Sequence, residues 1–176
     1  MVDAPKASGP KAQKERGPAT VGAHQGRTIF SLSEEETCDL GRAFSKSLKG
    51  GELILLEGEL GLGKTVFARG IAAGLGIPPE DVSSPSFTLI QEYTGGRLDM
   101  FHVDLYRLNS PEDIATLGIE EILSTGGVVV IEWGEKLTPY YRASAITVRL
   151  HDVGEGSRRI ELDRPPADGE QRLGDA

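Results

Sequence analysis

The most informative segment of the sequence is Gly58-Glu59-Leu60-Gly61-Leu62-Gly63-Lys64-Thr65. It matches the P-loop pattern Gly-x-x-x-x-Gly-Lys-Ser/Thr, in which glycines let the backbone turn its N–H groups inward toward phosphate. In such a loop the lysine neutralises charge on the β- and γ-phosphates, and the final hydroxyl is a ligand for Mg²⁺. We therefore predict that these eight residues bind a nucleoside triphosphate, that Lys64 also acts in catalysis, and that Thr65 binds the metal.

The flanks of the loop agree with this interpretation. Residues 53–56 form a continuous apolar run bounded by glycines, which predicts a strand buried on both faces. A helix is expected over residues 64–75, because Gly74, Gly76 and the Pro78-Pro79 pair end the helical spacing there. A strand before the motif and a helix after it disfavour the alternative that a glycine-rich turn matches by chance.

Hydrophobic periodicity and turn signals place the remaining elements. Ser33 is the expected N-cap of a helix over residues 34–48, and Gly118 is expected to break the helical stretch 110–123. Strands are expected at residues 27–32, 87–93, 97–105, 128–131, 145–150 and 158–162. The sequence thus predicts an α/β P-loop NTPase fold: one domain with a mixed sheet of central parallel strands, an antiparallel hairpin and C-terminal strands, flanked by helices.

The chain is organised as one domain, residues 28–163, between two tails. Residues 1–27 and 164–176 are poor in apolar side chains and are expected to be disordered. Residues 1–27 carry five basic and two acidic side chains, and residues 164–176 carry two basic and three acidic ones. The domain therefore keeps 12 of the 19 basic and 22 of the 27 acidic residues, which gives it a formal charge of −10. Such a surface repels nucleic acid, so any RNA should be held by a partner protein.

Composition narrows the class of protein further. The single cysteine, Cys38, excludes a disulfide within the chain and fits a reducing cytosol, so a cytoplasmic location is expected. No stretch approaches the roughly 20 apolar residues that a membrane span requires. No Asn/Thr-Lys-x-Asp segment for reading guanine is present, which favours ATP over GTP.

Two acids are candidates for the metal and for the attacking water of a hydrolysis reaction. Glu132 follows the buried strand 128–131, where the Walker B acid of P-loop proteins lies, and is predicted to bind Mg²⁺ and act in catalysis. Asp104 alternates with apolar residues, so a strand would place it on one face with His102. Asp104 is predicted to orient water or to complete the metal shell. The alternatives are surface carboxylates, and His102 is expected to be a packed strand histidine.

Two further features of the sequence fit both a structural and a functional interpretation. Ser83-Ser84-Pro85-Ser86-Phe87 lies where P-loop NTPases carry a switch-like loop, but it also fits a proline turn with caps. Trp133 directly follows Glu132, so it belongs either to the core or to the surroundings of the nucleotide or a partner.

Four segments together resemble the TsaE family over residues 28–163. They are the P-loop, Ser84-Pro85-Ser86-Phe87-Thr88-Leu89, His102-Val103-Asp104-Leu105-Tyr106-Arg107-Leu108 and Ile131-Glu132-Trp133-Gly134-Glu135. The resemblance implies an ATPase of tRNA threonylcarbamoyladenosine synthesis, weak alone. Such a protein acts on the TsaB–TsaD heterodimer, which modifies adenosine 37 of tRNAs reading ANN codons, and it meets tRNA only indirectly. A P-loop kinase of small molecules and a non-hydrolysing nucleotide-sensing module are the alternatives.

The resemblance also implies roles for single residues. Thr65 and Glu132 match magnesium ligands, and Asp104 matches a catalytic or metal-organising acid. Trp133 matches a tryptophan important for family activity, and we expect it near the nucleotide. The family's adenine pocket implies Leu32, Thr37 and Arg158. In the loop segment this chain has Ser86 where the family has threonine, which keeps the hydroxyl.

Overall fold

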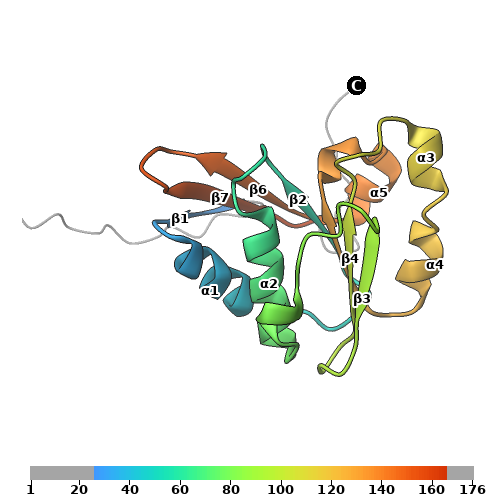
Figure 1. Ribbon diagram of the computed structural model, residues 1–176, viewed down its shortest axis with the longest axis horizontal. Coiled ribbons are helices and arrows are strands. Elements are labelled where there is room, and N and C mark those ends of the chain that lie inside the picture. Colours follow the sequence, from blue (N-terminus) through green and yellow to red (C-terminus); the bar gives the residue numbers. More distant parts are fainter. Residues whose placement is uncertain (1–25, 166–176) are drawn as a thin grey trace, which may run out of the picture.

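The computed structural model describes residues 26–165, which form one seven-stranded sheet with helices on both faces (Figure 1). The strand order is β1-β7-β6-β2-β5-β4-β3. The strands are β1 (Arg27–Ser31), β2 (Leu53–Glu57), β3 (Ile90–Tyr93), β4 (Met100–Asp104), β5 (Val128–Glu132), β6 (Ile146–Asp152) and β7 (Arg158–Asp163). Neighbours among β6, β2, β5 and β4 pair in parallel, whereas β3–β4, β6–β7 and β1–β7 are antiparallel. The predicted mixed sheet is confirmed.

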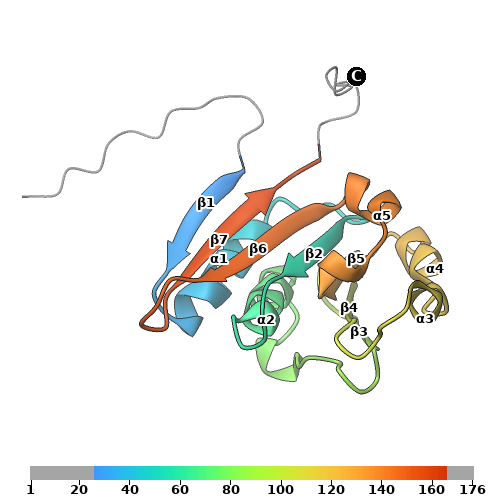
Figure 2. The same cartoon turned by 90° about the horizontal axis from the view of Figure 1, so that it is seen from above.

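Helices pack on the two faces of this sheet. One face carries α1 (Glu34–Ser45) and α2 (Lys64–Leu75), and the other carries α3 (Pro111–Ala115), α4 (Ile119–Ser124) and α5 (Pro139–Ser144). Two short 3₁₀ turns, η1 (Pro79–Asp81) and η2 (Gly134–Lys136), follow α2 and β5. Figure 2 shows α3, α4 and α5 gathered at the β5 and β4 end of the sheet, away from β1. Within residues 26–165, no helix is long and apolar enough to cross a membrane.

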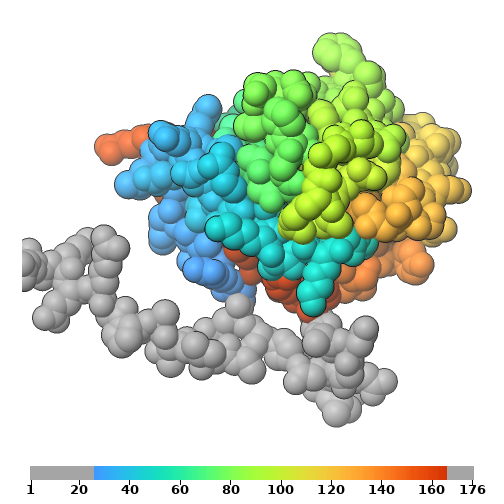
Figure 3. Space-filling view, turned by 90° about the horizontal axis from the view of Figure 1, so that it is seen from below, coloured from blue at the N-terminus to red at the C-terminus, as the bar shows by residue number. Residues whose placement is uncertain are grey.

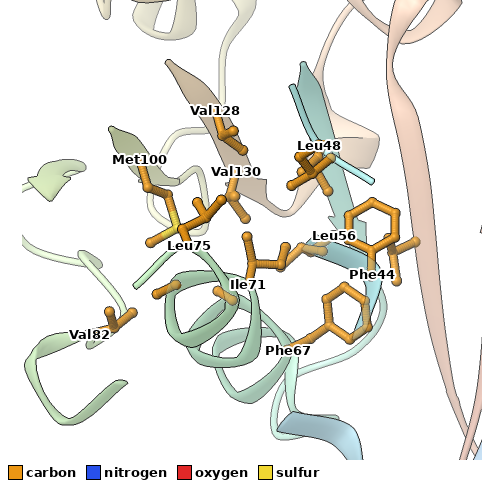
Figure 4. Close-up of a cluster of buried hydrophobic side chains, with 14 of the residues drawn as sticks. Phe44, Leu48, Leu56, Phe67, Ile71, Leu75, Val82, Met100, Val128 and Val130 are labelled. Carbon is orange, nitrogen blue, oxygen red and sulfur yellow. The ribbon is translucent and has the colours of Figure 1, made fainter. Parts of the chain in front are cut away.

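The alternation of strand side chains divides the core into two clusters. In β2, Ile54 and Leu56 join the cluster under α1 and α2 (Figure 4), whereas Leu53 and Leu55 join the cluster under the later helices. All four side chains are buried, and burying one such aliphatic side chain stabilises the fold by about 1.5–3 kcal/mol. The predicted two-sided burial of this strand is confirmed, and it anchors the loop that follows.

Helix α1 packs closely on the middle of α2. A Cβ atom at Gly70 would lie 2.0 Å from the carbonyl oxygen of Cys38, so only glycine allows the two helices to approach this closely. Figure 3 shows the surfaces of α1 and α2 directly against each other. The N-terminus of α1 is capped as predicted, because the Glu36 N–H donates to the Ser33 hydroxyl at 3.1 Å.

The ends of several elements differ from the prediction for identifiable reasons. Strand β3 begins at Ile90 instead of residue 87, because Leu89 has a left-handed φ of 65° and donates its N–H to Pro85. Strand β4 begins at Met100 instead of residue 97, because the Arg97 backbone N–H donates to the Leu75 carbonyl at the end of α2. The segments before β3 and β4 thus make contacts outside the hydrogen-bond ladder of the sheet.

Among the other boundaries, some agree with the prediction and some differ from it by a few residues. Helix α1 ends at Ser45 instead of residue 48, and Gly118, with a φ of 65°, separates α3 from α4 as predicted. Helix α5 was not predicted from the sequence. Strand β1 begins at Arg27, as the strand prediction has it, while residues 1–25 of the first predicted tail and 166–176 of the second lie outside the described residues.

Candidate active site

The three predicted site segments meet at one edge of the sheet. The P-loop follows β2, Glu132 ends β5 and Asp104 ends β4, and these three strands are parallel. Register places Glu132 opposite Leu56 on one side and opposite Asp104 on the other. Ligands of open α/β sheets bind beyond the carboxyl ends of the strands, so this edge is the candidate site.

The backbone of the P-loop depends on glycine at its first position and at the start of the helix. Gly58 has a φ of 134°, and a Cβ there would lie 2.5 Å from the Leu150 carbonyl oxygen. Gly63, with a φ of 94°, precedes α2, and no side chain caps that helix end. The first turn of the 12-residue helix also carries no acidic residue. Its N-terminal N–H groups and positive dipole end are therefore suited to a phosphate.

Lys64 is held inside the loop. Its side chain is 4% exposed, and its Nζ donates to the carbonyl oxygens of Gly58 at 2.7 Å and Glu59 at 2.8 Å. Burial lowers the pKa of the Lys64 ammonium, and the nearby carboxylates of Glu132, Glu135 and Asp104 oppose this shift. Phosphate oxygens are stronger partners for an ammonium than neutral carbonyls, so the group is poised to exchange them.

Thr65 and Glu132 contact each other directly. The Thr65 hydroxyl donates to Glu132 Oε1 at 2.7 Å, which leaves the lone pairs of the hydroxyl for a metal ion. Glu132 is 4% exposed, and the same Oε1 lies 3.0 Å from Nε2 of His102. The surface alternative for Glu132 is therefore wrong. His102 is fully buried as predicted, but its contact with Glu132 was not foreseen.

Asp104 is buried too, and its partners come from the loop before β3. Its Oδ2 accepts hydrogen bonds from the hydroxyls of Ser84 at 2.5 Å and Ser86 at 2.7 Å, and its Oδ1 accepts one from the Tyr106 N–H at 2.8 Å. With 2% exposure it is not a solvent-face aspartate, so that alternative is wrong. The loop, residues 83–89, is attached to the site through its serines.

Trp133 lies beside the P-loop lysine. Its ring centroid is 4.0 Å from Lys64 Nζ and 5.1 Å from the Tyr106 ring centroid. The backbone of Trp133 has a φ of 63°, which a bulky residue adopts only when its surroundings enforce it. Here a Cβ on Gly134 would meet the Leu55 Cβ at 2.5 Å, so only glycine lets the turn pack onto β2. Trp133 thus borders the site.

The three predicted adenine-pocket residues differ in their placement. Arg158 donates from Nε to the Leu62 carbonyl at 2.8 Å, so it borders the P-loop. Leu32 is 66% exposed and follows Ser31, which pairs with Arg158 in the sheet. Thr37 is fully buried with its hydroxyl bound to Ser31, so the structure does not support direct contact of its side chain with a base. A depression of about 280 Å³ lies nearby between β1 and α1, lined by Phe30, Glu36, Asp39 and Leu40.

The oxygen donors of the site suit a magnesium ion shared with a nucleotide. Among residues 26–165 no group of three or more His, Cys, Asp and Glu side chains is arranged to hold a metal ion alone. The donors at the P-loop are the Thr65 hydroxyl and the carboxylates of Glu132 and Asp104. Mg²⁺ is commonly bound by one or two carboxylates together with substrate phosphates and water, so this donor set fits it.

Comparison with known proteins gives consistent results. Residues 31–160 match the family described as threonylcarbamoyl adenosine biosynthesis protein TsaE. A relative from Nostoc sp., named tRNA threonylcarbamoyladenosine biosynthesis protein TsaE, is 44% identical over 140 residues, which is 76% of this chain and 83% of the relative. Relatives of the same name from Treponema pallidum and Bacillus subtilis are 40% and 34% identical, covering 75% and 74% of this chain and 96% and 80% of their own lengths.

A solved structure has the same fold. The crystal structure of Bacillus subtilis YdiB matches with a TM-score of 0.63 and 29% sequence identity, over 82% of this chain and 90% of that one. With the strand, P-loop and helix in a mixed sheet, this match confirms the predicted α/β P-loop NTPase fold.

Proposed function

Because the chain belongs to the TsaE family of tRNA threonylcarbamoyladenosine biosynthesis, we propose that it is the Mg²⁺-dependent ATPase subunit of that pathway. Family membership confirms the resemblance that the four sequence motifs indicated. The proposal adds that the chain binds and hydrolyses ATP, weakly alone. It also adds that hydrolysis acts on a TsaB–TsaD heterodimer, which threonylcarbamoylates adenosine in tRNAs reading ANN codons.

One observation carries the proposal of hydrolysis: the hydrogen bond from Thr65 to Glu132 at the start of α2. A loop that only bound phosphate would need its N–H groups and Lys64, but no buried carboxylate on the hydroxyl. Burying a carboxylate is unfavourable unless a cation or several donors compensate for it. Glu132 and Asp104 lie side by side beneath the loop, and both are deeply buried. Two such acids support metal-assisted chemistry over passive binding.

The position of each site residue indicates its role in the proposed reaction. Lys64 would release the carbonyl oxygens of Gly58 and Glu59 and bind the phosphates, assisted by the N–H groups that start α2. Thr65 and Glu132 would hold Mg²⁺, which when bound neutralises charge that develops on the phosphates. Asp104 would accept a hydrogen bond from the attacking water and orient it.

The partner assignment rests on charge and on family. Residues 28–163 carry a formal charge of −10, which opposes direct binding of tRNA. Tight binding of isolated tRNA by residues 28–163 at physiological salt would contradict this part of the proposal. The absence of a guanine-reading segment supports ATP as the nucleotide. A cytoplasmic location, without membrane contact, belongs to the same proposal.

Reconstituted tRNA modification tests the proposal. Wild-type chain, TsaB–TsaD, tRNA, ATP and a donor of the threonylcarbamoyl group would be combined, and modified adenosine counted over several turnovers. Lys64→Ala should lower multiple-turnover modification by about 10²-fold or more, because the loop loses its phosphate-binding cation. Lys46→Ala, at an exposed position beyond α1, is the matched control and should behave like wild type. Equal modification by Lys64→Ala and wild type would refute the proposal.

A further inference from the structure

His102 is a buried polar residue that packing alone does not explain. It lies in the middle of β4 between Phe101 and Val103, and its side chain is fully buried. Its Nδ1 is buried and has no hydrogen-bond partner. Leaving a buried polar atom without a partner costs about 1–3 kcal/mol, whereas an apolar side chain of similar size would avoid this cost. The imidazole must therefore contribute something that an apolar side chain cannot.

The only hydrogen bond found for this imidazole within residues 26–165 is the one to Glu132. A carboxylate only accepts hydrogen bonds, so Nε2 of His102 carries the hydrogen and donates it to Oε1 at 3.0 Å. The Thr65 hydroxyl donates to that same oxygen from α2. Oε1 is thus held by two donors from two buried elements. Among the described residues, no hydrogen bond is found to Oε2.

We propose that His102 is a positioning residue for the magnesium-binding carboxylate. By fixing Oε1 together with Thr65, it leaves Oε2 of Glu132 available to the metal ion or to its water. The inference rests on the proposed function, because it assigns His102 a role toward the Mg²⁺ of the ATP complex. Residues that orient a metal ligand in this way commonly change metal affinity or activity by about 10–100-fold when they are replaced.

This role predicts an effect on metal binding that is separate from nucleotide binding. Lys64 Nζ donates to the carbonyl oxygens of Gly58 and Glu59 and lies against the Trp133 ring, so its contacts do not depend on a hydrogen bond from His102. Without His102, Glu132 keeps one donor and can rotate. Affinity for ATP without metal should then be preserved, whereas the gain in affinity that Mg²⁺ brings should fall.

Trp133 provides the measurement, because it is the chain's single tryptophan and lies against Lys64. Its fluorescence would be titrated with ATP in EDTA and in excess Mg²⁺, and the ratio of the two dissociation constants taken as the metal enhancement. His102→Leu removes the donor, and His102→Gln restores an N–H near the Nε2 position. Met100→Leu, fully buried on the same strand and two residues away, is the control for strand packing.

We expect His102→Leu to reduce the metal enhancement by about 10-fold or more while metal-free ATP binding stays within about twofold of wild type. His102→Gln should recover most of the enhancement, and Met100→Leu should keep all of it. A folded His102→Leu protein with full enhancement would overturn the inference. If His102→Leu does not fold, His102→Gln decides: retention supports the role and loss overturns it. A wild-type chain that binds no ATP, or gains nothing from Mg²⁺, contradicts the proposed function instead.

Discussion

Two carboxylates stand opposite each other on neighbouring strands, yet different parts of the molecule hold them. Glu132 on β5 receives its hydrogen bonds from Thr65 in α2 and from His102 in β4. Asp104 on β4 receives two of its three from the serine hydroxyls of residues 83–89. The two acids are equally buried, so burial does not distinguish them. The difference lies in the elements that supply the donors, which are a helix and a strand for Glu132 but mainly a loop for Asp104.

The loop that holds Asp104 also faces solvent. Phe87, next to Ser86, is 84% exposed, and the Arg107 guanidinium lies over its ring. A hydrogen bond to a charged group contributes about 1.5–3 kcal/mol, which contact with a nucleotide or a partner can replace. We therefore expect the environment of Asp104 to change during the reaction cycle, while that of Glu132 stays fixed by the core.

The largest expected effect on ATP hydrolysis comes from removing the negative charge of Glu132. Glu132→Gln keeps the size of the side chain but removes the negative charge that we propose binds Mg²⁺. ATP hydrolysis should fall by about 10³-fold, because charge stabilisation at the metal is lost. Metal-free ATP binding should survive. Single-turnover hydrolysis and the fluorescence titration measure the two quantities, and hydrolysis within a few-fold of wild type would mean that Glu132 is not the metal acid.

Replacing Asp104, the acid that the loop holds, should lower the rate of ATP hydrolysis less than replacing Glu132 does. Asp104→Asn removes the carboxylate that we propose orients the attacking water, so hydrolysis should fall by about 10²-fold, as is typical of general-base residues. The affinity for ATP with Mg²⁺ should change little. Comparing the rate constant with the dissociation constant provides the check. A loss of affinity as large as the loss of rate would assign Asp104 to binding.

The serines should contribute less than the acid that they contact. Ser84→Ala and Ser86→Ala each leave the other serine hydroxyl bound to Oδ2 of Asp104. Each variant should therefore lower the hydrolysis rate by about fivefold, the equivalent of one hydrogen bond. Because the two hydroxyls also contact each other at 2.6 Å, the double variant should not show simple additivity. A single serine variant as inactive as Asp104→Asn would make the loop part of the catalytic group.

The smallest effect on the isolated chain is expected for Phe87→Ala. Exposed aromatic side chains are common anchors of protein interfaces, so this variant should hydrolyse ATP like wild type but respond less to TsaB–TsaD. Tyr140→Ala, at an exposed position on α5, is the control and should leave the response unchanged. An unchanged response for Phe87→Ala would remove the loop tip from the partner surface.

Local patterns predicted where the candidate site residues lie, because each one is tied to its own strand. Glu132 ends an apolar run, and the alternation around Asp104 placed it on one face with His102. The P-loop is a contiguous motif whose glycines and lysine need no partner from elsewhere in the chain to be recognised. The fold class followed from the same strands and turns.

The donors to the acids could not be predicted in the same way, because they depend on register between distant segments. His102 reaches Glu132 only through the pairing of β4 with β5, and Ser84 reaches Asp104 only through the left-handed turn at Leu89. Thr37 was expected at the adenine, but its hydroxyl contacts β1 instead. Helix α5 was missed because six residues give too little periodicity to detect.

The rate of ATP hydrolysis, measured with and without Mg²⁺ and with and without TsaB–TsaD, is the decisive measurement for the proposal that the chain is a Mg²⁺-dependent ATPase acting on the heterodimer. We expect a slow rate for the chain alone, loss of that rate in EDTA, and a clear change when the heterodimer is added. Lys64→Ala should abolish the activity under every condition. A rate that does not depend on Mg²⁺, or that is unchanged by the heterodimer at saturating concentration, would contradict the proposal.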